Sequence, residues 1–112
     1  MAKYRRKGLI PRALRLRRIA ADNHRCRACG LADPDNLQCD HVVPESDGGA
    51  TTFRNLQTLC SICNNRKGVT RLRRLPILPP VNWRQSLSTH NRKIRKRRGE
   101  FAVMLLKARG KQ

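Results

Sequence analysis

The sequence predicts a small α+β fold, with two short strands and a helix at its centre and a basic helix on either side. Three observations support this prediction. The chain has 112 residues, which is enough for one domain. Four of its five cysteines form two Cys-x-x-Cys pairs. Its 26 Lys and Arg residues, against 7 acids, give a net charge of +19.

The two cysteine pairs are Cys26/Cys29 and Cys60/Cys63. A gap of two residues lets both sulfurs of a pair reach one ion, at about 2.3 Å for zinc. The segment that they enclose is too short and too poor in aromatic residues to fold by apolar burial alone, so a structural zinc ion is expected. Cys39 stands outside both pairs and is expected to be a buried residue of a strand.

Charge divides the chain into three parts. Residues 1–25, a basic arm and helix, hold nine basic residues and one acid; residues 26–68, the core, hold four and five; residues 69–112, a proline-containing connector and basic helix, hold thirteen and one. A nearly neutral centre between basic flanks suits a protein that binds a cation at its centre and a polyanion around it. DNA, contacted mainly through its backbone, is the expected partner, and solvated charge runs are the alternative.

Hydrophobic periodicity and the positions of proline and glycine predict the elements in order. They are a helix from Pro11 to about Ala21, a strand over Leu37–Val43, a loop over Glu45–Arg54, a strand over Asn55–Leu59, a helix over Cys60–Lys67 that ends at Gly68, and a helix over Thr89–Ala108. Because Pro44 cannot donate to a strand ladder, the first strand ends just after Asp40 and His41, which then face a loop.

The last predicted helix has two different halves. Its first half is crowded with Lys and Arg, whereas its second half, FAVMLLKA, is apolar nearly all round. These apolar residues must be covered either by the core or by another chain. A homodimer or a protein partner bound through this helix is therefore the alternative to burial.

The central segment resembles the HNH endonucleases, which have a ββα-metal fold. The resemblance covers Cys26 to Gly68 and includes, in order, the first Cys-x-x-Cys, Asp40-His41 with Pro44, Gly48-Gly49, Asn55-Leu56, the second Cys-x-x-Cys and Asn64-x-x-Lys67-Gly68. By this resemblance His41 corresponds to the first letter of the family name and Asn55 to the second. Asn64 stands where the family has its final His. The resemblance implies hydrolysis of DNA to 5′-phosphate and 3′-hydroxyl ends.

The residues of this motif suit phosphodiester hydrolysis. His41 is the only imidazole inside it and is expected to act as the general base. Asp40 and Asn64 offer oxygen ligands for Mg²⁺ or Mn²⁺, with Asn65 as a rival ligand. Asn55 is expected to orient the His41 ring through a hydrogen bond.

Seven basic residues are expected to meet nucleic-acid phosphates: Arg54, Arg66, Lys67, Arg95, Lys96, Arg97 and Arg98. Two non-catalytic functions compete with the nuclease, namely a zinc-ribbon nucleic-acid binder and a basic structural protein of the ribosome-associated kind. The Asp40-His41 pair favours the nuclease, because a pure binding module has no need of it. With no apolar run of 18 residues, no membrane association is expected. The predicted location is cytoplasmic, at the nucleoid or on host DNA.

Overall fold

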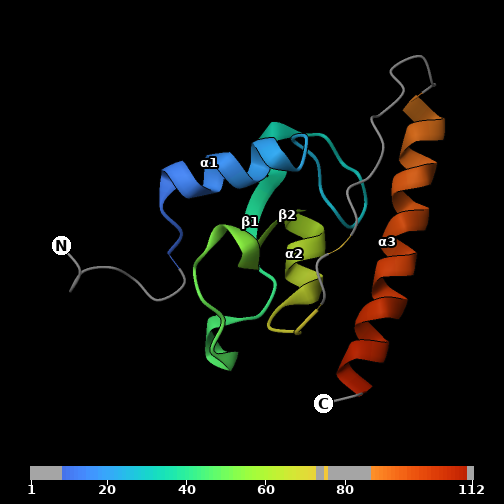
Figure 1. Cartoon of the computed structure of the whole chain (residues 1–112). Coiled ribbons are helices and arrows are strands. Elements are labelled where there is room, and N and C mark those ends of the chain that lie inside the picture. Colours follow the sequence, from blue (N-terminus) through green and yellow to red (C-terminus); the bar gives the residue numbers. More distant parts are fainter. Residues whose placement is uncertain (1–8, 73–74, 76–86, 111–112) are drawn as a thin grey trace.

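The computed structural model describes residues 9–72, 75 and 87–110, and within them it has the small α+β architecture that the sequence predicts (Figure 1). The elements are α1 (Arg12–Ala21), β1 (Leu37–His41), β2 (Leu56–Cys60), α2 (Ser61–Lys67) and α3 (Leu87–Gly110), with 3-10 turns at Pro34–Asn36, Glu45–Asp47 and Phe53–Asn55. The proline-containing connector and Trp83 lie outside the described residues.

The two strands form an antiparallel pair in which Leu37 lies opposite Cys60 and His41 opposite Leu56. β1 ends at His41, two residues before the predicted end, although the Val42 N–H still donates to the Asn55 carbonyl at 2.8 Å. β2 begins one residue later than predicted, because Asn55 closes a 3-10 turn.

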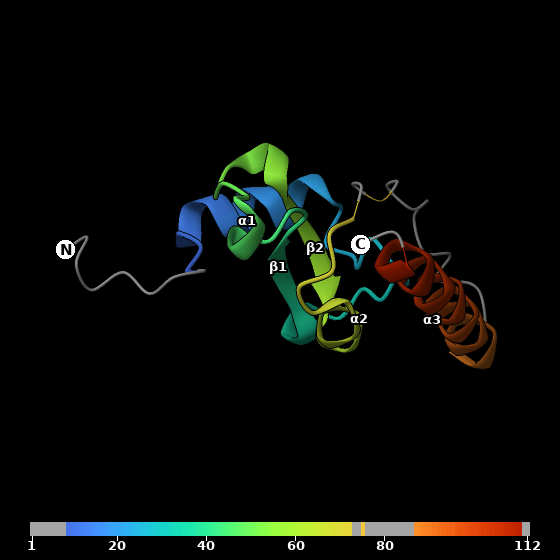
Figure 2. The same ribbon diagram turned by 90° about the horizontal axis from the view of Figure 1, so that it is seen from below.

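Helices cover both sides of this small sheet. α1 contacts both strands, as does α2, and α3 packs against α2. Figures 1 and 2 place α1 on one side of the sheet, with α2 and then α3 on the other. Side chains alternate between the two faces of a strand. Gln38 and Asp40 therefore face α2, where their partners lie, while Cys39 and His41 face the opposite way.

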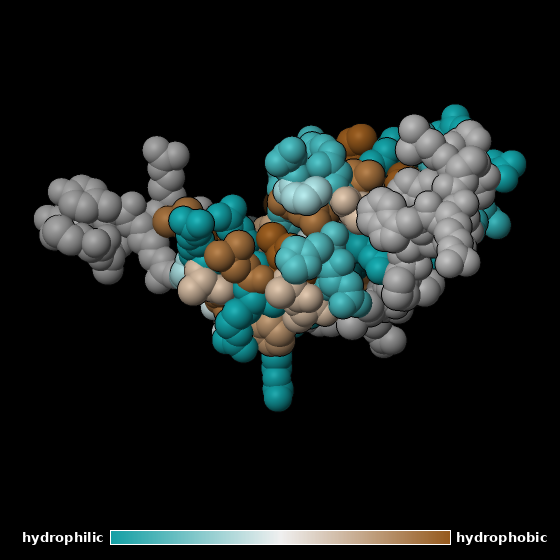
Figure 3. All heavy atoms as spheres, turned by 90° about the horizontal axis from the view of Figure 1, so that it is seen from above, coloured by the Kyte–Doolittle hydropathy of each residue, from teal (hydrophilic) through white to brown (hydrophobic). Residues whose placement is uncertain are grey.

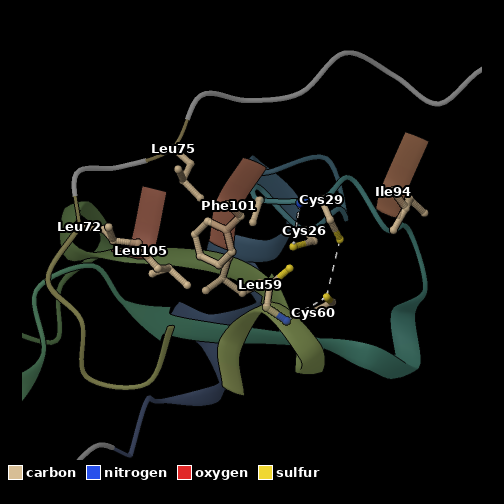
Figure 4. Close-up of a cluster of buried hydrophobic side chains, with 11 residues drawn as sticks. Cys26, Cys29, Leu59, Cys60, Leu72, Leu75, Ile94, Phe101 and Leu105 are labelled. Carbon is tan, nitrogen blue, oxygen red and sulfur yellow. Dashed lines mark hydrogen bonds between the residues drawn. The ribbon is translucent and has the colours of Figure 1, made fainter. Parts of the chain in front are cut away.

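The core lies between the sheet, α2 and α3 (Figure 4). Phe101 and Leu105, one helical turn apart on α3, are each 2% exposed and pack with Leu59 and with the cysteines. The core therefore covers the apolar face of α3. This burial accounts for Phe101 and Leu105, and a homodimer or a protein partner through the exposed apolar residues of the same half stays a prediction. Val103 and Leu106, on the outer face, remain exposed.

A buried carboxylate joins α1 to the rest of the fold. Asp22, which is 2% exposed, accepts hydrogen bonds on Oδ1 from Arg18 at 2.8 Å and from Arg27 at 2.5 Å. Its Oδ2 accepts from the backbone N–H of Thr58 in β2 at 3.0 Å. Arg27 also donates to the Leu75 carbonyl. Both arginines are buried, so Asp22 supplies the negative charge that keeps them inside.

We predict that Asp22→Ala lowers the free energy of unfolding by about 3–5 kcal/mol, because it leaves two buried guanidinium groups without their partner. Urea unfolding checks this. Asp22→Asn, which preserves the shape, should cost less and keep the protein measurable. The exposed Asp35→Ala serves as the control, and a loss in Asp22→Ala no larger than that of the control contradicts the prediction.

Candidate functional site

The two cysteine pairs converge in the structure. Cys26 and Cys29 lie in the turn after α1, Cys60 ends β2 and Cys63 lies in the first turn of α2. All four are buried, and their sulfurs lie within 4.8 Å of one another. In Figure 4 the labelled sulfurs of Cys26, Cys29 and Cys60 point toward a common centre. Each turn is stabilised locally, since the Cys29 and Cys63 N–H groups approach the sulfurs three residues earlier at 3.4 and 3.5 Å.

This cluster fits a tetrahedral zinc ion. A zinc–sulfur distance of about 2.3 Å places tetrahedral sulfurs about 3.8 Å apart, and the Cys29 and Cys60 sulfurs are 3.7 Å apart. Hydrogen bonds from the neighbouring thiols, that of Cys26 first, lower the pKa of Cys29 to about 7. They also hold the pKa of Cys60 far below its ordinary value. Hydrogen bonds within the cluster raise the pKa of Cys26 and Cys63 instead, so in the metal-free cluster the thiolate, which is the form that binds metal, is favoured at Cys29 and Cys60.

Arg98 of α3 lies beside this cluster rather than on a surface free to meet phosphates. Its Nη2 donates to the Cys60 sulfur at 3.6 Å. Burial favours the neutral guanidine, but hydrogen bonds to Cys29 and Cys60 outweigh it and raise the pKa of Arg98 above its ordinary value. A zinc ion with four thiolates carries a charge of about −2, which this cation partly offsets.

The remaining cysteine and the nearby histidine lie outside the cluster. Cys39 is half-buried in β1, and burial raises the pKa of its thiol to about 11, so the thiol stays neutral near pH 7. His24 is exposed, with a positive φ of 58° at Asn23 and 55° at His24 marking the turn after α1. Neither residue is needed to complete a four-sulfur site.

A second polar group lies at the end of β1. Asp40 Oδ2 is 2.9 Å from the Nζ of Lys67, whose side chain is fully buried in the last turn of α2. The same Nζ donates to the His41 carbonyl at 2.9 Å. Lys67 is therefore an internal partner of Asp40, and its predicted contact with phosphates stays a prediction.

The oxygen atoms around Asp40 have bonding capacity to spare. Among the described residues, no donor is aligned for a hydrogen bond to Asp40 Oδ2, although the Lys67 ammonium is close enough for an ion pair. Gln57, directly opposite on β2, is fully buried, and neither end of its amide has a hydrogen-bond partner there. Asn64 donates from Nδ2 to Gln38 at 2.6 Å, which leaves its carbonyl oxygen to accept. Carboxylate and amide oxygens are ligands that Mg²⁺ and Mn²⁺ prefer, but of these carboxylate- and amide-bearing residues only Asp40 lines the pocket described below.

His41 points away from Asp40, into the loop between the strands. Its Nε2 lies 2.9 Å from the Thr51 hydroxyl and 3.7 Å from a carboxylate oxygen of Glu45. The structure places Asn55 differently from the expected ring contact. Asn55 Oδ1 accepts from the Val43 N–H, and its Nδ2 donates to the carbonyls of Val43 and Ala50. Asn55 therefore orders the loop that surrounds His41.

Gly49 is essential to the same loop. A Cβ built at this position would lie 1.7 Å from the Val43 carbonyl oxygen and 2.9 Å from Asn55 Nδ2. Only glycine allows this close approach. Gly48 precedes it with a φ of 85°, which also favours glycine. The Gly48-Gly49 pair thus lets the loop fold back against the end of β1.

The two sides of the β1 end open into one pocket of about 340 Å³. Asp40 and His41 line it together with Glu45 and the buried Lys67. A carboxylate, an imidazole and an ammonium group therefore share one small concave site, within reach of one substrate group.

Residues 26–70 match the family model described as HNH endonuclease. By this match the segment is similar to the HNH endonucleases. The match confirms the resemblance found in the sequence. Among solved structures, the Type II-C Cas9 enzyme from Actinomyces naeslundii is similar, with 21% identity and a TM-score of 0.49 over 90% of this chain and 12% of that chain. A similarity this distant carries nothing on function. No match was found among curated proteins.

Three contacts were missed by the sequence analysis: Lys67 with Asp40, Thr51 with His41, and Arg98 with Cys60. Each contact joins residues from different elements or from a loop, and no local sequence pattern predicts such a contact. None of the helices in the described part combines the length and apolar character needed to cross a membrane.

We predict that Arg98→Ala speeds zinc release to a chromophoric chelator by about 10–100 fold, the usual effect of losing a partner of a metal ligand. Cys60→Ser removes a ligand and should leave no stoichiometric zinc. Lys96→Ala, an exposed basic residue on the same helix, is the control and should release zinc at the wild-type rate. Equal release rates in Arg98→Ala and Lys96→Ala would contradict the role of Arg98.

Proposed function

We propose that this protein is a metal-dependent DNA endonuclease that hydrolyses phosphodiester bonds and leaves 5′-phosphate and 3′-hydroxyl ends. The observation that carries the proposal is the shared pocket of Asp40, His41 and Lys67, inside a segment that matches the HNH family. Hydrolysis needs a base for the attacking water and positive charge for the phosphoryl oxygens. This pocket supplies groups for both tasks.

His41 is the proposed general base. An imidazole accepts a proton efficiently near neutral pH, which suits the deprotonation of water. The ring is only 9% exposed and is held by Thr51, so its orientation is restricted. Asn55 contributes indirectly, because it holds the loop that carries Thr51.

Asp40 and Asn64 are the proposed ligands of a catalytic Mg²⁺ or Mn²⁺. When bound there, such an ion supplies positive charge to the phosphoryl oxygens and to the leaving 3′ oxygen. Lys67 forms an ion pair with Asp40 and adds positive charge to the same pocket. The cysteine cluster is the proposed structural zinc site, distinct from this one.

The surface around the matched segment suits a DNA backbone. Exposed basic residues are Arg12, Arg15 and Arg17 on α1, Arg54 and Arg66 in the core, and Arg92, Lys93, Arg95 and Lys96 on α3. On the face shown in Figure 3, hydrophilic and apolar side chains of the described residues are intermixed. Arg97, half-buried and 4.0 Å from Glu100, completes the basic half of α3.

One observation favours a non-catalytic zinc-ribbon binder. Lys67 already neutralises Asp40, as it would in a domain whose carboxylate serves only packing. Against this, packing alone explains neither an imidazole at the same pocket nor a loop built around it. The nuclease therefore accounts for more of the site.

Substitution of His41 separates the two functions. We predict that His41→Ala lowers cleavage of plasmid DNA in Mg²⁺ or Mn²⁺ by about 10²–10⁴ fold, the usual contribution of a positioned base. DNA affinity, measured by fluorescence anisotropy, should stay at the wild-type value. His24→Ala is the matched control, because it removes an exposed histidine outside the pocket. The nuclease proposal fails, and the zinc-ribbon binder replaces it, if His41→Ala cuts as fast as this control. The same holds if the wild type does not cut DNA in the presence of any divalent ion tested.

DNA binding should weaken steeply with salt. Each phosphate contact contributes about −0.9 to the slope of log affinity against log salt concentration. We predict that the double variant Arg95→Ala, Lys96→Ala flattens this slope by up to about 1.8. Met104→Ala, a neutral exposed position on the same helix, should leave the slope unchanged. An unaltered slope in the double variant would place these two residues away from the DNA.

A further inference from the structure

Thr51 and Glu45 lie beside the proposed base, in the loop between β1 and β2, and the motif gives neither of them a role. The Thr51 hydroxyl donates to Glu45 Oε1 at 3.0 Å. The Thr51 hydroxyl oxygen, Oγ1, also lies 2.9 Å from His41 Nε2. Glu45 is itself 3.7 Å from Nε2, too far for a direct hydrogen bond. The three side chains form a hydrogen-bonded chain of groups, from the His41 ring to the Thr51 hydroxyl to the Glu45 carboxylate.

The number of donor hydrogens on Thr51, Glu45 and the His41 ring decides which ring nitrogen carries the proton. A hydroxyl has one hydrogen to donate, and an ionised carboxylate can only accept. Thr51 therefore uses its hydrogen on Glu45 and offers a lone pair to His41. To make a hydrogen bond with that lone pair, Nε2 must carry a hydrogen. A neutral imidazole carries only one, so Nδ1 is left as the acceptor.

The surroundings of the ring agree with this assignment. Within the described part of the chain, Thr51 makes the hydrogen bond to the ring, and it does so at Nε2. His41 lines the pocket that Asp40 and Lys67 share. The nitrogen that remains free to accept a proton is thus Nδ1.

We propose that Thr51, held by Glu45, is a positioning residue that keeps His41 in the Nε2–H tautomer, so that Nδ1 takes the proton from the attacking water. This proposal rests on the proposed role of His41 as the base. In the step, an O–H bond of water breaks and its proton forms an N–H bond at Nδ1. The oxygen lone pair forms the bond to phosphorus, and the P–O3′ bond breaks with its electron pair on the leaving oxygen.

The same chain stabilises the ring after the proton has moved. The imidazolium carries hydrogens on both nitrogens, so Thr51 keeps its bond to Nε2 without rearranging. The Glu45 carboxylate, whose side chain is 26% exposed, lies 3.7 Å from Nε2, which is within ion-pair distance of the charged ring. Asn55 assists from the other side of the loop, because it binds the Ala50 carbonyl next to Thr51.

Nitrogen-15 NMR of the His41 ring tests the tautomer without any cleavage. At about pH 8.5, where an ordinary imidazole is neutral, the wild type should have its hydrogen on Nε2, protected from exchange with solvent. Thr51→Val should lose that protection, and Thr51→Ser should retain it. In Glu45→Ala the Thr51 hydroxyl becomes free to donate to Nε2, so the Nδ1–H tautomer should gain population. Thr52→Val, at the exposed neighbouring threonine, should change nothing.

Kinetics provide the second measurement. Thr51→Val should lower kcat by about 10² fold, the cost of misplacing a reacting group by about 1 Å, with KM little changed. Thr51→Ser should recover much of that loss. A hydrogen on Nδ1 in the wild type, or a Thr51→Val protein with wild-type exchange protection and kcat, would overturn the proposal. Should the wild type fail to cut DNA, the proposed function fails, while the NMR experiment still decides the tautomer.

Discussion

The four cysteine sulfurs join three parts of the chain: the turn after α1, the end of β2 and the first turn of α2. They also form part of the core, since four of the eleven residues in the buried cluster are cysteines. A chain with so few aromatic residues has little else with which to fill that space. The position of β2, and with it the register that brings Asp40 opposite Gln57, therefore depends on sulfurs held within 4.8 Å of one another. A metal bound by these sulfurs would therefore stabilise both the cysteine cluster and the strand pairing around Asp40.

The alternation of side chains along β1 explains why two adjacent residues can perform unlike tasks. Asp40 points toward α2 and its buried lysine, whereas His41 points into the loop with Thr51. Each side chain has its own set of partners. The two meet again only at the strand end, where both line one pocket. A dipeptide at the end of a short strand can thus bring a carboxylate and an imidazole to one pocket through two separate sets of partners.

Much of this arrangement was predictable because it depends on local spacing. The Cys-x-x-Cys pairs, the strand that ends before Pro44 and the helix that ends at Gly68 all follow from neighbours in the sequence, and the structure has each of them. The contacts that escaped prediction depend on how elements pack. The sequence predicts that Lys67 meets phosphates and gives no sign that its side chain is buried, because lysines rarely are. Its burial follows from the position of α2 over Asp40. Arg98 meets Cys60 across 38 residues of sequence, and no periodicity in α3 separates it from its exposed neighbours.

The place of α1 and α3 in the core changes what counts as the autonomous folding unit. The segment that matches the HNH family begins at residue 26, yet Asp22, which anchors the Thr58 N–H of β2, precedes it. It ends at residue 70, yet Phe101 and Leu105 lie far beyond and cover Leu59. A chain trimmed to the matched segment would open its sulfur cluster and its sheet to water. The helices α1 and α3, which provide much of the exposed basic surface, also pack against the rest of the fold, so an evolutionary change in either helix must preserve that packing.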